Sequence, residues 1–155
     1  MIVVSDTSPV LNLEAVNRLT LLRDLYREIV IPSAVETELR RNGFRIDDSW
    51  MRVVSARSRD EVGVLRASLD PGEAEAIVVA AEMNADLLLV DEKRGRRIAA
   101  ARGLQVAGLL GVLAEAKVRG LITSCGPVLN AMIGAGFWIG DDLRAKYLRG
   151  LGEIE

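Results

Sequence analysis

The sequence predicts an α/β fold with a central, mainly parallel sheet that is buried on both faces. Two short and wholly apolar runs, Ile2–Val4 and Leu87–Val90, are typical of strands in such a sheet. Helix-like segments alternate with these and further apolar runs, which favours βαβ units. With 155 residues, half of them hydrophobic, the chain has the size and composition of a single domain, residues 1–155.

Local signals place the individual elements. Pro9 suits the first turn of a helix, and leucines at helical spacing follow it. Pro32 and the stretch Asp70-Pro71-Gly72 open two longer helices, the first of which ends near Gly43. The predicted strands span 2–4, 28–31, 51–54, 87–90 and 104–107. The predicted helices span 9–16, 19–26, 33–41, 60–69, 73–84, 93–102, 109–118, 126–134 and 141–149.

The composition excludes several kinds of catalytic site. The chain has no histidine, which rules out Ser-His-Asp triads, imidazole zinc sites and a histidine general base. Its one cysteine, Cys125, rules out an intramolecular disulfide and a four-cysteine zinc site. A carboxylate-built Mg²⁺ or Mn²⁺ site is then the leading candidate, because hard divalent cations prefer oxygen ligands.

Charge and hydropathy indicate where the protein acts. Met1–Val4 runs into Ser5 and Asp6 without a signal-peptide pattern, and no apolar stretch reaches the length of a membrane span. We therefore expect a cytoplasmic protein without membrane contact. The formal charge of −2 gives no bulk attraction to nucleic acid, so such binding needs a local basic patch. The helix over 93–102 offers one, with a solvated helix face as the alternative interpretation.

Two aspartates follow the two most apolar strands. Asp6 and Asp91 stand at strand ends, and the carboxyl ends of parallel strands are where α/β proteins bind ligands. Each alone is equally typical of a helix cap. Their joint placement at one edge of the sheet favours a functional site.

Two helices supply further candidate acids. Glu38 lies at the margin of an apolar helix face and can lean inward, whereas Glu36 is placed to pair with Arg40 on the surface. Glu73 and Glu75, two residues apart, cannot share one face of a helix. Glu73 aligns with the apolar side and is the site candidate, and Glu75 is the second choice. Clustered carboxylates repel one another unless a cation neutralises them, and a divalent ion can also activate water for displacement at phosphorus.

The order and spacing of these motifs resemble the PIN-like domain family of metal-dependent ribonucleases, which includes VapC-type toxins. The resemblance rests on Val3–Ser8, Ile31–Leu39, Gly72–Ile77 and Leu87–Asp91. The tail, with Gly108–Leu113 and Gly136-Phe137-Trp138, is similar to a subgroup described as predicted nucleic-acid-binding proteins.

The resemblance implies a three-layer α/β/α sandwich, PIN-like and Rossmann-like, with an Mg²⁺ or Mn²⁺ cofactor and RNA phosphodiester hydrolysis as its reaction. By the same resemblance, the catalytic and metal-binding residues are Asp6, Glu38, Glu73 and Asp91. Ser8 would support a ligand. Apart from the resemblance, the basic run that follows Asp91 favours Lys93, Arg94, Arg96 and Arg97 as nucleic-acid-binding residues, because arginine binds phosphate through its fork of donors. A small antitoxin protein and a homodimer are the implied partners.

Two departures from the family pattern concern metal geometry. Leu89 occupies a place where many toxin members have threonine, and the third acid is a glutamate instead of the commoner aspartate. A noncatalytic nucleic-acid-binding module with the same fold therefore remains an alternative function. A receiver-like phospho-acceptor is disfavoured because no lysine closes a strand, and a nucleotide-binding fold because no glycine-rich phosphate loop is present.

Overall fold

The protein is built around a five-stranded parallel sheet. The computed structural model describes residues 1–155. The strands are β1 (Val3–Ser5), β2 (Ile29–Pro32), β3 (Met51–Val54), β4 (Leu87–Leu89) and β5 (Val106–Ala107), in the spatial order β3-β2-β1-β4-β5. β1 lies at the centre, with Val4 paired to Val30 of β2 and to Leu88 of β4. Every predicted strand is present; β3 has its predicted bounds and the others are shifted by one or two residues at their ends.

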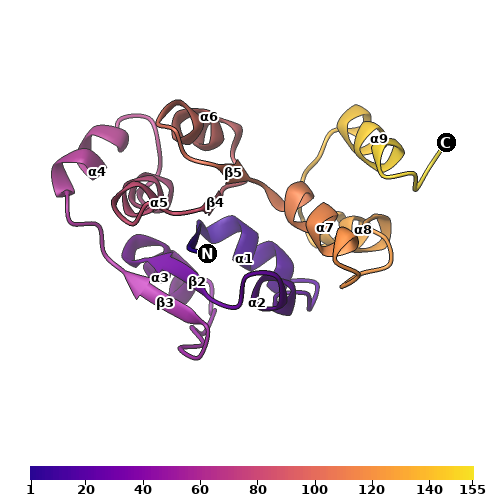
Figure 1. The fold of residues 1–155 in the computed structure, drawn as a ribbon, viewed down its shortest axis with the longest axis horizontal. Coiled ribbons are helices and arrows are strands. Elements are labelled where there is room, and N and C mark those ends of the chain that lie inside the picture. The colour runs from indigo at the N-terminus through magenta and orange to yellow at the C-terminus, as the bar shows by residue number, and fades with distance from the viewer.

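Helices connect the strands and cover both faces of the sheet (Figure 1). They are α1 (Thr7–Glu14), α2 (Thr20–Tyr26), α3 (Ser33–Arg41), α4 (Arg59–Leu65), α5 (Pro71–Glu82), α6 (Lys93–Ala101), α7 (Leu109–Val118), α8 (Gly126–Gly134) and α9 (Asp141–Gly150). Each corresponds to a predicted helix. α4 is shorter than the helix predicted over 60–69, because the chain turns after Leu65 to bring Asp70 to the start of α5.

The core has two parts, one on each face of the sheet. Val3 and Leu89 pack with side chains of α1, α2, α3 and α7 to α9. Val4 and Leu88 pack on the opposite face with α4, α5 and α6. Successive residues of a strand point to opposite faces, so wholly apolar strands are buried on both sides. The predicted three-layer α/β/α sandwich is confirmed.

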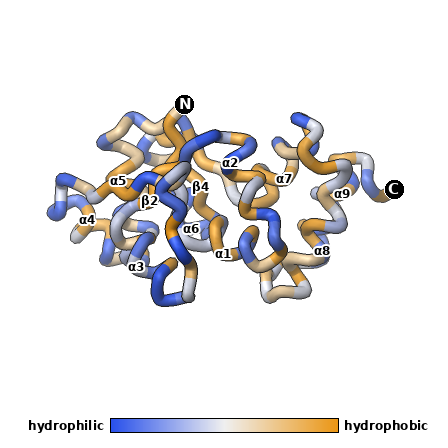
Figure 2. Tube along the Cα trace, turned by 90° about the horizontal axis from the view of Figure 1, so that it is seen from below, coloured by the Kyte–Doolittle hydropathy of each residue, from blue (hydrophilic) through white to orange (hydrophobic).

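The last three helices form one end of the molecule, opposite α4 (Figure 1). In the hydropathy-coloured trace of Figure 2, hydrophobic segments run through the centre of the molecule, where β4 lies. The Glu153 carboxylate joins the C-terminal helices by accepting hydrogen bonds from the Cys125 and Gly126 amides and from Lys117. No helix has the combination of length and hydropathy that a membrane span requires.

Candidate metal centre

Two of the predicted acids leave the sheet at the same edge. Asp6 follows β1 and Asp91 lies just beyond β4, and these neighbouring strands are in register, with Ser5 opposite Leu89. The Asp6 amide donates to the Leu89 carbonyl at 2.9 Å, which extends the pairing to the first acid. The topology therefore brings both carboxylates to the carboxyl ends of adjacent strands.

Asp6, Glu38 and Asp70 form a compact acidic group. One carboxylate oxygen of each lies within 4.8 Å of the others; Asp6 is buried, Glu38 half-buried and Asp70 exposed. Glu38 leans from α3 toward the sheet edge. Its two oxygens accept hydrogen bonds from the Thr7 hydroxyl and, at 3.0 Å, from the Gly72 amide. The carboxylate of Glu38 is thus fixed on both sides.

Sequence reasoning missed Asp70 as a site residue and treated it only as part of a helix start. It does cap α5, since its carboxylate accepts from the Glu73 amide at 2.8 Å. The same carboxylate reaches Asp6 and Glu38. The position of Asp70 in the sequence could have indicated this role, because the N-cap residue lies at the same end of the helix as a first-turn side chain such as Glu73.

Glu73 and Asp91 surround this compact group without belonging to it. Glu73 is only 4% exposed, in the first turn of α5. Asp91 is fixed by the Leu109 amide at the start of α7, which donates to Oδ1 at 2.8 Å. Both are coupled to the group through their charges: Asp91 raises the pKa of Asp6, and Asp70 and Asp6 raise the pKa of Glu73. The four predicted acids and Asp70 therefore form one electrostatic unit.

Three buried carboxylate oxygens in this unit have no hydrogen-bond partner. They are Asp6 Oδ1, Glu73 Oε2 and Asp91 Oδ2. Buried polar atoms are normally paired, and leaving a carboxylate oxygen without a donor is costly. A hard divalent cation satisfies such oxygens, because Mg²⁺ and Mn²⁺ prefer carboxylate ligands. The donor set of this site fits that kind of ion.

The pKa values reflect the same crowding of negative charge. Burial is the main cause that raises the pKa of Asp6 to about 7, and the neighbouring carboxylates of Asp70, Glu38 and Asp91 add to it. Burial likewise raises the pKa of Glu73 to about 8, with Asp70 as the next cause. Burial also raises the pKa of Asp91, against the lowering effects of the Leu109 amide, the Ser8 hydroxyl and the Arg96 charge. Without a cation, Glu73 is therefore mostly protonated at neutral pH and Asp6 is about half protonated.

Glu75 lies in different surroundings from Glu73. Its fully buried carboxylate accepts from the Ser33 hydroxyl at 2.7 Å and from the Ala34 and Ala56 amides, and it pairs with Arg59 at 2.5 Å. Every one of these partners lies on α3, on α4 or in the segment before α4. These contacts account for the burial of Glu75 without a metal ion.

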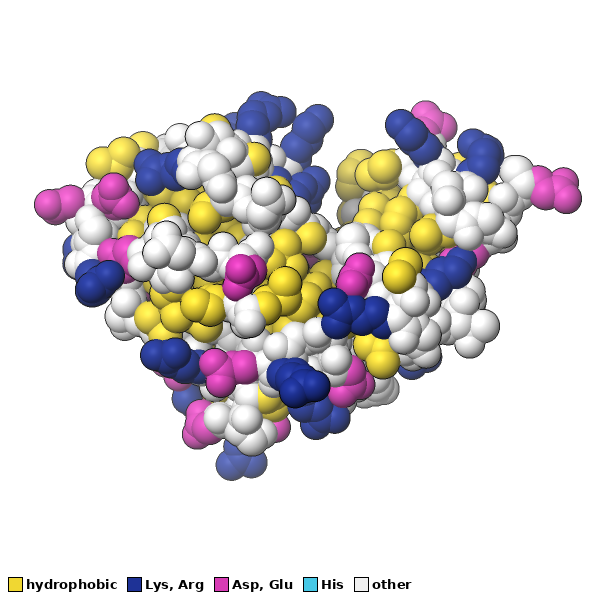
Figure 3. All heavy atoms as spheres, viewed as in Figure 1, with side chains coloured by type: hydrophobic (Ala, Val, Ile, Leu, Met, Phe, Trp, Pro, Cys, Tyr) yellow, Lys and Arg dark blue, Asp and Glu magenta, His cyan; other side chains and the backbone are white.

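The basic residues of α6 divide into two groups. Arg96 turns toward the site, and its guanidinium donates to the carbonyls of Val90, at 3.3 Å, and Asp91. Lys93, Arg94 and Arg97 are exposed. In Figure 3, Lys and Arg side chains stand on both sides of a notch between the regions of α6 and α9. The exposed group is therefore available for a ligand in solution.

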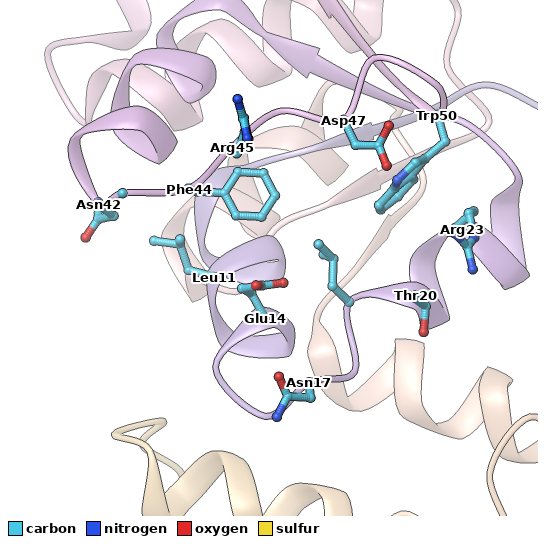
Figure 4. A pocket seen from close by; sticks show the side chains of 12 residues that line it. Leu11, Glu14, Asn17, Thr20, Arg23, Asn42, Phe44, Arg45, Asp47 and Trp50 are labelled. Carbon is cyan, nitrogen blue, oxygen red and sulfur yellow. The ribbon is translucent and has the colours of Figure 1, made fainter.

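A surface pocket lies apart from the acids (Figure 4). It has a volume of about 570 Å³ and is formed by α1, the start of α2 and the segment between α3 and β3. Its charged lining residues are Glu14, Arg23, Arg45 and Asp47, two of each sign. None of the clustered acids lines it, so it has no part in the acidic site.

Comparisons with known proteins agree with this geometry. A family model described as PIN domain matches residues 2–153. Among solved structures, a PilT N-terminus domain protein from the hyperthermophilic archaeon Sulfolobus solfataricus P2 is similar, with a TM-score of 0.60 and 26% sequence identity. That similarity covers 74% of this chain and 92% of the archaeal chain. No curated protein matches the chain.

Proposed function

The chain belongs to the PIN domain family, and on that premise we propose that it is a metal-dependent nuclease that hydrolyses RNA phosphodiester bonds with Mg²⁺ or Mn²⁺. One observation carries the proposal: the three buried carboxylate oxygens without partners, on Asp6, Glu73 and Asp91. Asp6 belongs to the compact group with Glu38 and Asp70, and the charges of that group are coupled to those of Glu73 and Asp91. The result is an all-oxygen donor set suited to a hard divalent cation.

The chain's own contacts prepare these acids for that role. The Leu109 amide holds Oδ1 of Asp91, which leaves Oδ2 free to face a ligand. The Thr7 hydroxyl and the Gly72 amide each hold one oxygen of the Glu38 carboxylate and so fix its orientation. Once a bound cation has ionised it, the Glu73 carboxylate would accept a hydrogen bond from the attacking water. A bound divalent ion would supply an activated water and charge stabilisation at phosphorus.

The substrate assignment is supported by the exposed basic side chains of α6. Lys93 and Arg94 follow directly on Asp91 and Glu92 in the chain, Arg97 lies about one helical turn further on, and all three are exposed. Arginine binds phosphate through its fork of donors. An RNA backbone bound here would run beside the acidic site, and its affinity would fall steeply with added salt.

The proposed partners follow from the family resemblance in the sequence. They are a small antitoxin protein and a second copy of this chain. Trp138 and Val118, whose side chains are 85% and 80% exposed, offer apolar surface for protein contacts. Light scattering of the purified chain, alone and with a candidate antitoxin, tests both partners. A monomer that no antitoxin binds or inhibits would overturn this part of the proposal.

The metal site is tested by isothermal titration calorimetry with Mn²⁺. We expect the wild type to bind Mn²⁺. We expect Asp6→Asn and Asp91→Asn to lose binding, because each substitution removes the negative charge of a carboxylate that has an unpartnered oxygen. Glu36→Gln is the matched control, since the Glu36 carboxylate pairs with Arg40 on the surface of α3. It should bind like the wild type.

Activity is tested with single-stranded RNA, and with DNA of the same sequence, in the presence of Mn²⁺ or Mg²⁺. The wild type and Glu36→Gln should cleave RNA, and Asp6→Asn should not, while its circular dichroism spectrum stays unchanged. Retained metal-dependent cleavage by Asp6→Asn contradicts the assigned site. RNA binding without any metal binding by the wild type would favour the noncatalytic module instead.

A further inference from the structure

Three glycines lie directly against three of the clustered carboxylates. Gly72 faces Glu38, Gly95 faces Glu73, and Gly108 faces Asp91. The three glycines come from different parts of the chain: the first turn of α5, the first turn of α6, and the residue before α7. All three therefore lie at the start of a helix, and each faces a different acid of the site.

Gly72 shows the tightest of these approaches. A Cβ atom at this position would lie 2.7 Å from Oε1 and 2.9 Å from Oε2 of Glu38, distances that real Cβ atoms essentially never show. The nearest atoms around this Cβ position all belong to the Glu38 carboxyl group. The missing side chain therefore provides the space that the carboxylate occupies, while the Gly72 amide donates to Oε1 at 3.0 Å.

Gly95 and Gly108 repeat the arrangement at the other two acids. A Cβ atom at Gly95 would lie 2.7 Å from Glu73 Oε2, which is one of the oxygens without a partner, and 3.0 Å from a methyl carbon of Val90. A Cβ atom at Gly108 would lie 3.1 Å from Asp91 Oδ1 and 3.3 Å from Arg96 Nη1. Each methyl group would therefore fill space that the site needs.

Backbone conformation does not require glycine at these three positions. None of them has a positive φ, in contrast to Gly43, Gly103 and Gly136. Alanine would be accommodated by the local backbone, and in a helix it is the better residue. Space beside a carboxylate is thus the only constraint that the structure shows at Gly72.

We infer that Gly72, Gly95 and Gly108 are positioning residues of the acidic site, which set where the carboxylates of Glu38, Glu73 and Asp91 stand. The inference rests on the proposed metal-dependent function. A methyl group at Gly72 meets the far end of a flexible side chain, so the carboxylate moves and the fold remains. The substitution therefore separates damage to the site from damage to the fold.

The decisive variant is Gly72→Ala, with Gly63→Ala and Gly134→Ala as controls. The two control glycines also lie within helices, and a Cβ atom at either would have nothing within 4 Å. We expect Gly72→Ala to keep the Tm of the wild type within a few degrees and to weaken Mn²⁺ binding by about 10–100-fold, the range for residues that orient metal ligands. Both controls should bind Mn²⁺ like the wild type.

Two further measurements keep the inference independent of the proposed function. In the metal-free protein, the ¹³C NMR signal of the Glu38 carboxyl carbon should move in Gly72→Ala and stay in place in both controls. In a Glu38→Ala background, Gly72→Ala should not lower the Tm and should have no additional effect on metal binding, because no carboxylate is left to displace.

The outcomes separate the two claims. A wild type that fails to bind Mn²⁺ overturns the proposed function, while a displaced Glu38 signal in Gly72→Ala still supports the positioning role. An unmoved Glu38 signal, or Mn²⁺ binding by Gly72→Ala equal to that of the wild type, overturns the positioning role. A large loss of Tm in Gly72→Ala alone would also overturn it, because the methyl group would then disturb the fold and not the carboxylate.

Discussion

Asp70 combines two roles in one side chain. It caps α5 through the Glu73 amide, and its carboxylate belongs to the compact group with Asp6 and Glu38. A serine in its place keeps a hydroxyl that can cap the helix, whereas an alanine does not. Both substitutions remove the negative charge, and both relieve the same repulsion from the neighbouring acids. Comparing the two therefore isolates the cap.

We expect Asp70→Ser to weaken Mn²⁺ binding, because one carboxylate of the group is gone. Asp70→Ala should weaken binding equally and should also be less stable than Asp70→Ser by about 1 kcal/mol, the usual value of an N-cap. Urea unfolding and calorimetry measure the two effects. Mn²⁺ binding that is unchanged in both variants would show that Asp70 is only a cap.

At the level of elements, Glu75 joins α5 to α3 and to the segment before α4. From α5 it reaches the first turn of α3 through Ser33 and Ala34, and the segment before α4 through Ala56. These contacts lower the pKa of Glu75 against the effect of its burial. Because α3 supplies Glu38 and α5 supplies Glu73, this junction sets how the two helices that hold these acids meet.

Removal of the Glu75 carboxylate should destabilise the fold strongly. Glu75→Ala leaves donors unpaired beside a fully buried position, and the loss of one partner of a buried charged network costs about 3–5 kcal/mol. Arg59→Ala is the matched comparison. The Arg59 side chain is 61% exposed and Glu75 keeps its donors Ser33, Ala34 and Ala56, so the loss of Arg59 should cost less than the loss of Glu75.

Urea unfolding checks both expectations, and Mn²⁺ binding to folded Glu75→Gln checks the location of the site. We expect that variant to bind Mn²⁺ at the wild-type level. Lost binding with unchanged stability would assign Glu75 to the metal site instead.

The elements were largely predictable from the sequence because parallel strands and capped helices have strong local signals. The strand over 51–54 was predicted with its observed bounds, β3 (Met51–Val54). α5 was harder to interpret, since all residues from Gly72 to Ala80 are buried and the helix has no polar face. Reasoning from helix faces therefore could not show that Glu75, like Glu73, is buried.

The site was predictable only where an acid follows a strand or leans from a helix margin. Asp6 and Asp91 have that signal, because sheet topology alone brings strand ends together. Thr7 contacts Glu38, and Asp70 approaches Asp6 and Glu38. These partners are far apart in the sequence, and the contacts also depend on side-chain rotamers. Such contacts appear only once α3 and α5 are packed against each other.

For the whole molecule, two sets of carboxyl groups give stability opposite dependences on pH. Asp6 and Glu73 have pKa values raised to about 7 and about 8, from ordinary values of 3.8 and 4.5. Between these limits the folded protein binds more protons than the unfolded chain, so stability falls as the pH rises. Glu75 and Glu153 have lowered pKa values, and their contribution is lost only as the pH falls below the ordinary carboxyl range. The metal-free protein should therefore be most stable in mildly acidic solution.

A divalent cation should reverse the fall in stability toward neutral pH. The ion competes with protons for the oxygens of Asp6 and Glu73, so it binds more tightly as these groups ionise, and binding to the folded state alone raises the Tm.

Thermal unfolding from about pH 5 to about pH 8 tests this expectation. Without metal, the Tm of the wild type should fall across this range, and that of Glu73→Gln should fall less, because glutamine cannot ionise. The increase in Tm caused by Mn²⁺ should grow from the acidic to the neutral end for the wild type and be smaller throughout for the variant. An increase of the same size at both ends would mean that the ion binds away from these buried carboxylates.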